Sequence, residues 1–253
     1  MIGRTRPKRF VIQIIAAGMN NRNGKMKFGS IRELVFGLED GIVSTTGAVI
    51  GIAAGTGNQK VVILSGLVIV VVEALSMAAG TYLSSKSKRQ LLERQIEEER
   101  QEIHADPESE REELRQMYRE RGFCSEEIEA MVRHITKDRE LWLEEMMHKE
   151  LGIGFSQLED TKTGAAIMWL AYTIGGMVPV VPFLLFDIQT AMLIAFALGL
   201  VGLFAIGAWK AKVTKTNILA GGLEMLLISA AAGVAGYLIG RLVGVATGIE
   251  VGV

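Results

Sequence analysis

A long apolar segment runs from Val61 to Ser84 and reads VVILSGLVIVVVEALSMAAGTYLS. It contains a single charged residue, Glu73. A hydrocarbon layer about 30 Å thick is crossed by roughly 20 residues of helix, and this segment is long enough for that. It predicts a helix that spans a membrane.

Four further segments share this length and apolar character: Ile31 to Gly55, Gly164 to Phe186, Ile188 to Trp209 and Ile218 to Val243. Hydrophobic residues make up 49% of the 253 residues, and the mean hydropathy is +0.31. Both values exceed what the core of a soluble domain requires. We therefore predict an all-α membrane protein with five transmembrane helices.

The segment between the second and third predicted spans has the opposite composition. Of the 28 acidic residues in the chain, 21 lie between Glu93 and Asp160. Glycine and proline are scarce here, which favours a compact helical domain over a disordered linker. Ser84 to Asp106 should continue the second span as a charged helix. Pro107 suits the first turn of the next helix, Gly122 marks its end, and Ser125 is positioned to cap a third.

Basic residues predict the orientation, because the loops and tails on the cytoplasmic side collect lysine and arginine. They place the N-terminus and the insertion in the cytoplasm. The predicted organisation is a basic cytoplasmic tail, two transmembrane helices, an acidic helical metal-binding domain, three transmembrane helices and a short non-cytoplasmic tail, over residues 1–30, 31–84, 85–160, 161–245 and 246–253. An alternative reads Phe10 to Met19 as the apolar part of a signal peptide.

Composition excludes several classes of protein. Cys124 is the only cysteine, so the chain has no intrachain disulfide and no CxxC zinc or redox site. The balanced net charge and the few aromatic residues argue against nucleic acid as a partner.

Carboxylates inside predicted spans are candidate functional residues, because a charge facing lipid is costly. They are Glu33, Glu39, Asp40, Glu73 and Glu224. Glu33 and Asp40 lie two helical turns apart and share a face, as do Glu73 and Met77 one turn apart. Oxygen ligands with a thioether sulfur favour a first-row transition metal such as iron(II). Met77 is also compatible with ordinary packing in an apolar helix.

The insertion offers a second candidate site. Glu99 and Glu102, and then Glu110 and Glu113, are i, i+3 pairs on either side of Pro107. In two antiparallel helices these four carboxylates could converge on a cation; the alternative is a solvated charged face. Glu145 and His148 form one Glu-x-x-His pair, an element that di-iron bundles use twice. Met146 and Met147 between them could be soft ligands or core residues.

These motifs resemble the vacuolar iron transporter family. The similar stretches are Arg32-Glu-Leu-Val-Phe-Gly-Leu-Glu-Asp40-Gly41, Glu73-Ala-Leu-Ser-Met77-Ala-Ala-Gly80-Thr-Tyr82, and the acidic insertion ending in Met146-Met147-x-x-Glu150. The resemblance implies a five-span homodimer that exchanges cytosolic iron(II), and often manganese(II), for protons. It implies a transport path through Asp40, Glu73 and Met77. It also implies cytoplasmic metal binding by Glu99, Glu102, Glu110, Glu113, Met146, Met147 and Glu150.

We therefore expect a transporter, not an enzyme, that moves divalent metal out of the cytoplasm by proton antiport. Its expected partners are metal ions, protons, membrane lipid and a second copy of the chain, with no prosthetic group. The membrane would be the cell membrane in a prokaryote, and otherwise a vacuolar or other organelle membrane. The alternatives are a membrane-anchored metal sensor or scaffold, and a di-iron oxidase. Glu39 and Glu224 receive no role.

Overall fold

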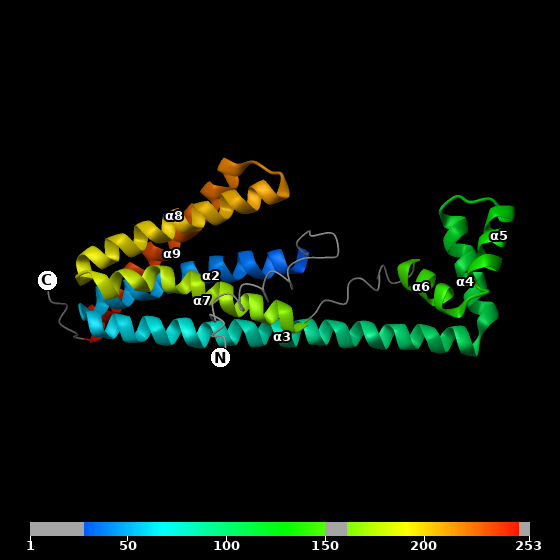
Figure 1. Cartoon of the computed structure of the whole chain (residues 1–253), viewed down its shortest axis with the longest axis horizontal. Coiled ribbons are helices and arrows are strands. Elements are labelled where there is room, and N and C mark those ends of the chain that lie inside the picture. The colour runs from blue at the N-terminus through cyan, green and yellow to red at the C-terminus, as the bar shows by residue number, and fades with distance from the viewer. Residues whose placement is uncertain (1–27, 150–160, 248–253) are drawn as a thin grey trace, which may run out of the picture. The chain divides into compact units, whose positions relative to one another are not determined.

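The computed structural model describes residues 28–149 and 161–247, and every regular element in these ranges is an α-helix (Figure 1). The helices are α2 (Phe28–Thr56), α3 (Gln59–Ala105), α4 (Pro107–Glu120), α5 (Ser125–Ile135), α6 (Arg139–Lys149), α7 (Thr161–Leu185), α8 (Ile188–Thr214) and α9 (Ile218–Thr247). This confirms the predicted all-α class. The tails predicted at the two ends of the chain lie largely outside the described residues.

Five of these helices, α2, α3, α7, α8 and α9, are long and apolar enough to cross a membrane. They coincide with the five predicted spans. Helix α3 is 47 residues long and continues without a break from its apolar half into a charged half, as the sequence predicted. Its C-terminal part belongs to the insertion between the second and third spans.

The chain divides into two compact units. The first contains the described residues up to Tyr82 and from Thr161 onward, and the second begins at Leu83. We describe each unit separately.

Helix α2 is the centre of the first unit and packs most extensively against α7 and α9 (Figure 1). Glycine makes this close approach possible. A Cβ atom at Gly41 would lie 2.8 Å from the backbone nitrogen of Gly176 in α7. One at Gly51 would lie 2.7 Å from the carbonyl oxygen of Gly236 in α9. Two rows of glycines thus face each other, Gly47, Gly51 and Gly55 on α2 and Gly236, Gly240 and Gly244 on α9. We call these rows the glycine ladders; such small residues are common where membrane helices pack closely.

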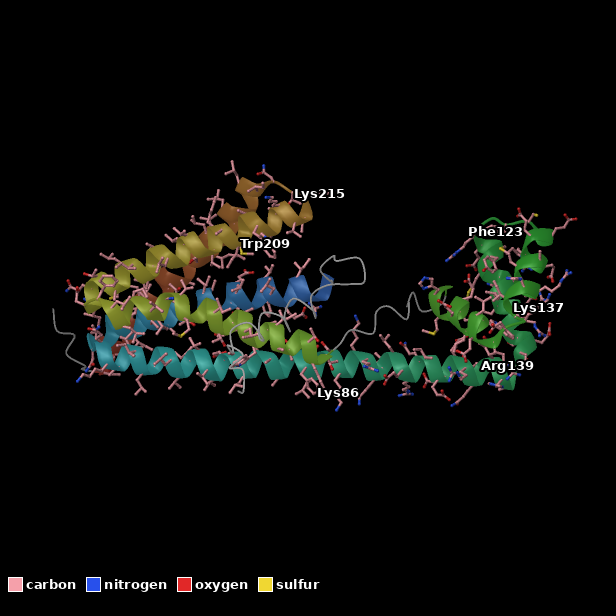
Figure 2. The ribbon with its side chains drawn as sticks, viewed as in Figure 1. Lys86, Phe123, Lys137, Arg139, Trp209 and Lys215 are labelled. Carbon is pink, nitrogen blue, oxygen red and sulfur yellow. The ribbon has the colours of Figure 1, made fainter. Side chains whose placement is uncertain are left out.

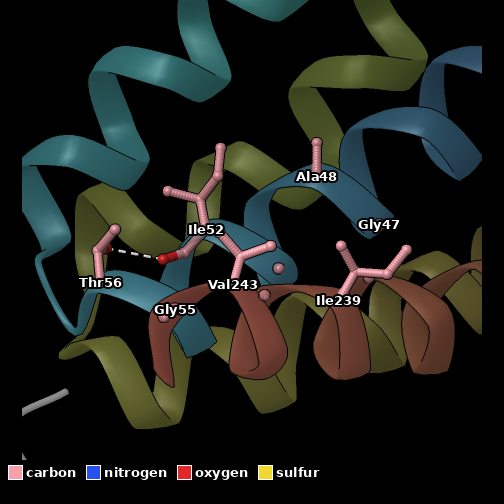
Figure 3. Close-up of a pocket in the computed structure, with 11 residues that line it drawn as sticks. Gly47, Ala48, Ile52, Gly55, Thr56, Ile239 and Val243 are labelled. Carbon is pink, nitrogen blue, oxygen red and sulfur yellow. Dashed lines mark hydrogen bonds between the residues drawn. The ribbon is translucent and has the colours of Figure 1, made fainter. Parts of the chain in front are cut away.

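An apolar groove of about 450 Å³ runs beside the α2–α9 contact (Figure 3). Its walls are glycines with the side chains of Ala48, Ile52, Thr56, Ile239 and Val243. The Thr56 hydroxyl donates to the carbonyl oxygen of Ile52 at 2.7 Å and accepts from the backbone N–H of Asn58 at 3.3 Å. The lining of the groove is therefore almost entirely apolar.

The second unit consists of the end of α3 with α4, α5 and α6. Asp106 caps α4 by accepting a hydrogen bond from the backbone N–H of Ser109 at 3.1 Å, and Pro107 occupies the first turn. Gly122 follows α4 with a φ of +86°, a conformation that favours glycine. Both boundaries were predicted. The cap of α5 was predicted one residue too late: it is Cys124, whose N–H donates to Glu127 at 2.9 Å.

Candidate functional site

The predicted intramembrane carboxylates Asp40 and Glu73 come together in the first unit. Asp40 is partly buried on α2, and Glu73 lies on α3, close enough for the two charges to repel each other. Among the described residues, the charge that acts on Asp40 is that of Glu73. Two neighbouring carboxylates in a membrane-spanning region form a site that a cation would stabilise.

Two hydroxyl groups complete this cluster. Ser44, one turn after Asp40, donates to the backbone carbonyl oxygen of Asp40 at 2.6 Å. Its oxygen also lies 2.7 Å from the phenol oxygen of Tyr172 in α7. Because Ser44 has one proton and gives it to Asp40, Tyr172 is the donor in the second bond. Tyr172 is completely buried and lies within electrostatic range of Asp40 and Glu73.

Sequence reasoning missed Ser44 and Tyr172. Ser44 shares a helix face with Asp40 at spacing i, i+4, a signal that was present but not used. Tyr172 carries a weaker signal, a phenol in the middle of the third span, which must find a hydrogen-bond partner away from water. We refer to Asp40, Ser44, Glu73 and Tyr172 as the carboxylate cluster.

Met77 is partly buried on α3, one turn beyond Glu73. The Glu73 side chain is exposed in the single chain, among the exposed apolar residues Val71, Val72 and Leu75. This face of α3 therefore carries a carboxylate in a surface that is otherwise suited to lipid.

Glu33 extends the polar face of α2 beyond Asp40. Its side chain is buried, with 4% of its area exposed, and one carboxylate oxygen lies 2.6 Å from the Arg32 guanidinium. The other oxygen, Oε2, has no hydrogen-bond partner among the described residues. A Cβ atom at Gly164 would lie 3.9 Å from Glu33 Cγ and 3.8 Å from Thr81 Cγ2, so Glu33 lies where α2, α3 and α7 meet.

Glu39 and Glu224 belong to a different environment. The electrostatic neighbours of Glu39 include Lys210 of α8 and Glu224 of α9, as well as adjacent Asp40. Consecutive residues of α2 thus have different main partners: Asp40 interacts with α3 and α7, and Glu39 with α8 and α9.

In the second unit, Met146 and Met147 are core residues. They are 0% and 1% exposed and pack in an apolar cluster with Leu114, Trp142 and Leu143 among others. Of the predicted glutamate ligands, Glu99 and Glu110 are buried, whereas Glu102 and Glu113 are exposed. Glu150 lies outside the described residues.

Among the described residues, no group of three or more His, Cys, Asp or Glu side chains is arranged to hold a metal ion. The carboxylates of each i, i+3 pair differ in burial, so one member of each pair faces inward. The seven-residue metal site stays a prediction, because one of its ligands is not described.

Glu145, the carboxylate of the single Glu-x-x-His pair, accepts a hydrogen bond from the Tyr118 phenol at 2.6 Å. Burial and this hydrogen bond raise the pKa of Tyr118 above its ordinary value, so the phenol stays protonated. His148 is exposed. This arrangement gives Glu145 a structural role and offers little support for an oxidase centre.

Comparison with known proteins places these features in a family. The chain is 27% identical over 214 residues to Vacuolar iron transporter 1 of Arabidopsis thaliana, covering 84% of this chain and 86% of the relative. It is 28% identical over 208 residues to Vacuolar iron transporter 1 of Oryza sativa subsp. japonica, covering 82% of each. It is 26% identical over 232 residues to the Vacuolar iron transporter of Plasmodium falciparum, covering 87% of this chain and 85% of the relative.

The sequence pattern that defines the VIT family matches residues 31–241, which include all five candidate spans up to the last turns of α9 and the whole insertion. That match covers far more than half of the chain. The chain therefore belongs to the VIT family, the family of the vacuolar iron transporters that its motifs resemble.

Proposed function

We propose that this protein transports divalent transition metal across a membrane, iron(II) and also manganese(II), in exchange for protons. The observation that carries the proposal is the carboxylate cluster, in which Asp40 and Glu73 approach each other inside the membrane-spanning unit. Two carboxylates can share a divalent cation or bind protons in its absence. Metal and protons then compete for the same oxygen lone pairs, which is the physical requirement for exchange.

In this mechanism Asp40, Glu73 and Met77 line the path. Ser44 and Tyr172 orient the segment around Asp40, since Ser44 bonds the Asp40 carbonyl and Tyr172 holds Ser44. The Met77 sulfur favours a softer ion than magnesium or calcium.

We further propose that the protein acts as a homodimer with the exposed face of α3 in the interface. Glu73 is exposed in the single chain, among Val71, Val72 and Leu75. A carboxylate facing hydrocarbon is costly, and a second copy would bring Glu73 into a protein-lined path between the subunits. The apolar neighbours would pack against the same partner.

The insertion is proposed to lie in the cytoplasm and to collect metal through Glu99, Glu102, Glu110, Glu113, Met146, Met147 and Glu150. The membrane is proposed to be the cell membrane in a prokaryote and an organelle membrane otherwise, as the names of the vacuolar relatives suggest. A membrane sensor, scaffold or oxidase would not require Asp40 and Glu73 in mid-span.

The direct test is uptake of iron(II), manganese(II) and zinc(II) by proteoliposomes, with and without a pH gradient. We expect iron(II) to accumulate when the lumen is acidic, and dissipation of the gradient by a protonophore to abolish accumulation. Metal movement that is indifferent to the gradient would exclude antiport. The absence of uptake for every ion would favour the sensor or scaffold.

Replacing Met77 by leucine tests the role of the sulfur. The two side chains have similar volume, so the fold should lose less than about 1.5 kcal/mol of stability. We expect iron(II) uptake to fall about tenfold and manganese(II) uptake to fall less, because manganese is the harder ion. Equal uptake of both ions by the Met77→Leu variant and the wild type would assign Met77 to packing.

Replacing Met146 by leucine tests the insertion site in the same way. Met146 is fully buried in the core of the second unit, and leucine would preserve that core at a cost below about 1.5 kcal/mol. If Met146 is also a ligand, titration of the full chain should show about tenfold weaker iron(II) binding. Leu143→Ile, a neighbouring core change of similar cost that leaves every sulfur in place, is the control, and binding that falls equally in both variants would make Met146 a core residue only.

A further inference from the structure

Hydroxyl side chains in the membrane-spanning helices commonly bond to their own helix. Five of them donate to the carbonyl oxygen four residues earlier in the chain, at 2.6–3.0 Å: those of Ser44, Thr56, Thr173, Thr214 and Thr247. This bond is the simplest way to satisfy a hydroxyl in a helix that is surrounded by hydrocarbon. A hydroxyl that does not make it therefore points to a different partner.

Thr46 on α2 and Ser229 on α9 are two such hydroxyls. Both residues are 0% exposed, and neither side-chain oxygen has a hydrogen-bond partner among the described residues. Nearly all buried polar groups in proteins are paired, with protein or with ordered water, because an unpaired one has lost its hydration without compensation. These two hydroxyls therefore require a partner.

The two hydroxyls face the same small region beside α8. Helices α2, α8 and α9 pack against one another (Figure 1). A Cβ atom at Gly199 of α8 would lie 3.1 Å from Thr46 Oγ1 and 3.3 Å from Ser229 Oγ. The two oxygens do not bond to each other. Glycine keeps the region between them free of a side chain, so both can reach one small ligand placed there.

Apolar residues enclose this region on both sides. The residues four positions away on the three helices are at most 3% exposed and belong to one apolar cluster: Ile42, Leu203 and Met225. On the other side, Phe196 and Ile50 both lie near Gly233 of α9. The hydroxyls thus form a thin polar layer between two apolar layers. An ion would meet no opposite charge here, so the layer suits a small neutral molecule.

The polar layer lies deep within the membrane-spanning helices. Trp209 and Lys215 lie toward the same end of α8, as Figure 2 shows. Tryptophan and lysine at the end of a span are typical of the membrane interface. Gly199 precedes Trp209 by ten residues, which is about 15 Å along a helix at about 1.5 Å per residue. The partner of the two hydroxyls is therefore not a lipid headgroup.

We propose that one ordered water molecule binds beside Gly199 and bridges the hydroxyls of Thr46 and Ser229. Buried waters in proteins bond to two to four polar groups that would otherwise be unsatisfied. The water would accept a hydrogen bond from one hydroxyl and donate one to the other, each at about 2.8 Å. It would link α2, which carries Asp40, to α9. This inference depends on helix packing alone and is independent of the proposed transport.

Thermal unfolding of the full-length protein in detergent tests the bridge, with Thr46→Val and Ser229→Ala made singly and together. Each single variant should melt about 2–4 °C lower than the wild type, because hydrogen bonds to the water are lost. The double variant should lose less than the sum of the two, since the first change already breaks the bridge. Thr173→Val is the control, because Thr173 bonds to its own helix, and it should stay within about 1–2 °C of the wild type.

Radiolytic hydroxyl labelling tests whether the bridging molecule is water. An X-ray pulse oxidises side chains next to bound water, and Met225, one helical turn from Ser229 and 3% exposed, is the reporter. We expect Met225 to be labelled in the wild type and in Thr173→Val, and to lose most of its label in the double variant. Gly199→Ala keeps both hydroxyls but places a methyl group against them, so it should also lose the label. Gly202→Ala should keep it.

Three results would overturn the water site. A melting temperature above that of the wild type for Thr46→Val would mean that its hydroxyl is buried without a partner. Fully additive losses in the double variant would mean that the two hydroxyls bond separately. Losses that are not additive, without label on Met225 in the wild type, would assign Thr46 and Ser229 to a direct hydrogen bond with each other.

Discussion

Asp40→Asn is expected to lower gradient-driven iron(II) uptake by about 100-fold in proteoliposomes. Asparagine has nearly the same shape as aspartate and keeps the backbone bond from Ser44 to residue 40, because that bond uses the carbonyl oxygen. What is lost is the negative charge beside Glu73. Removing a group that hydrogen-bonds to a metal ligand lowers metal affinity or activity by about 10- to 100-fold. Removing the charge of the ligand itself should therefore lower uptake by about 100-fold, the upper end of that range.

Glu224→Gln is the matched control for this experiment. It also removes a carboxylate from a membrane-spanning helix, but Glu224 is exposed on α9 and interacts with Glu39, outside the carboxylate cluster. We expect iron(II) uptake by Glu224→Gln to stay within about twofold of the wild type, because this variant loses no proposed metal ligand. Elution as the same oligomer would show that both variants are folded. Wild-type uptake by Asp40→Asn would remove Asp40 from the proposed path.

The spans could be predicted from the sequence because a membrane imposes a simple requirement. A segment such as Val61 to Ser84 must be helical and long enough to satisfy its backbone in hydrocarbon, whatever it packs against. The boundaries at Pro107 and Gly122 were equally local, since both depend on the backbone geometry of one residue. Each of these features could therefore be predicted from a short stretch of sequence, without knowing what it packs against.

Features that depend on packing between helices were harder to predict. The hydrogen bond between Ser44 and Tyr172 joins residues 128 positions apart in the sequence. No sequence pattern within α2 or α7 predicts that these two side chains meet. Spacing left Met146 and Met147 open as core or ligands, and the structure shows both buried in the core. Burial does not by itself decide whether their sulfurs also bind metal, which is why the leucine variant is needed.

The close approach of α2 to α9 leads to a second prediction with a large expected effect, a loss of folding stability when Gly51 is enlarged. Gly51→Leu should prevent the first unit from folding correctly, because even the Cβ atom would lie 2.7 Å from the carbonyl oxygen of Gly236 and 3.3 Å from its carbonyl carbon. Those are backbone atoms, which cannot turn away as a side chain can. Overpacking of a tight core costs about 1–3 kcal/mol and sometimes more, and here four side-chain atoms must be accommodated between two backbones.

Gly202→Ala provides the control for this variant. Among the described residues, the only atom within 4 Å of a Cβ at Gly202 is Ile42 Cδ1 at 3.2 Å, the end of a flexible side chain, and alanine is favoured over glycine in a helix by about 1 kcal/mol. We expect Gly202→Ala to elute as the wild-type oligomer with a melting temperature near that of the wild type, and Gly51→Leu to aggregate or melt at a much lower temperature. Gly51→Ala should fall between them. If Gly51→Leu melted like the wild type, α2 and α9 would have to be further apart in the membrane than described, and the glycine ladders would then have no role in packing these two helices together.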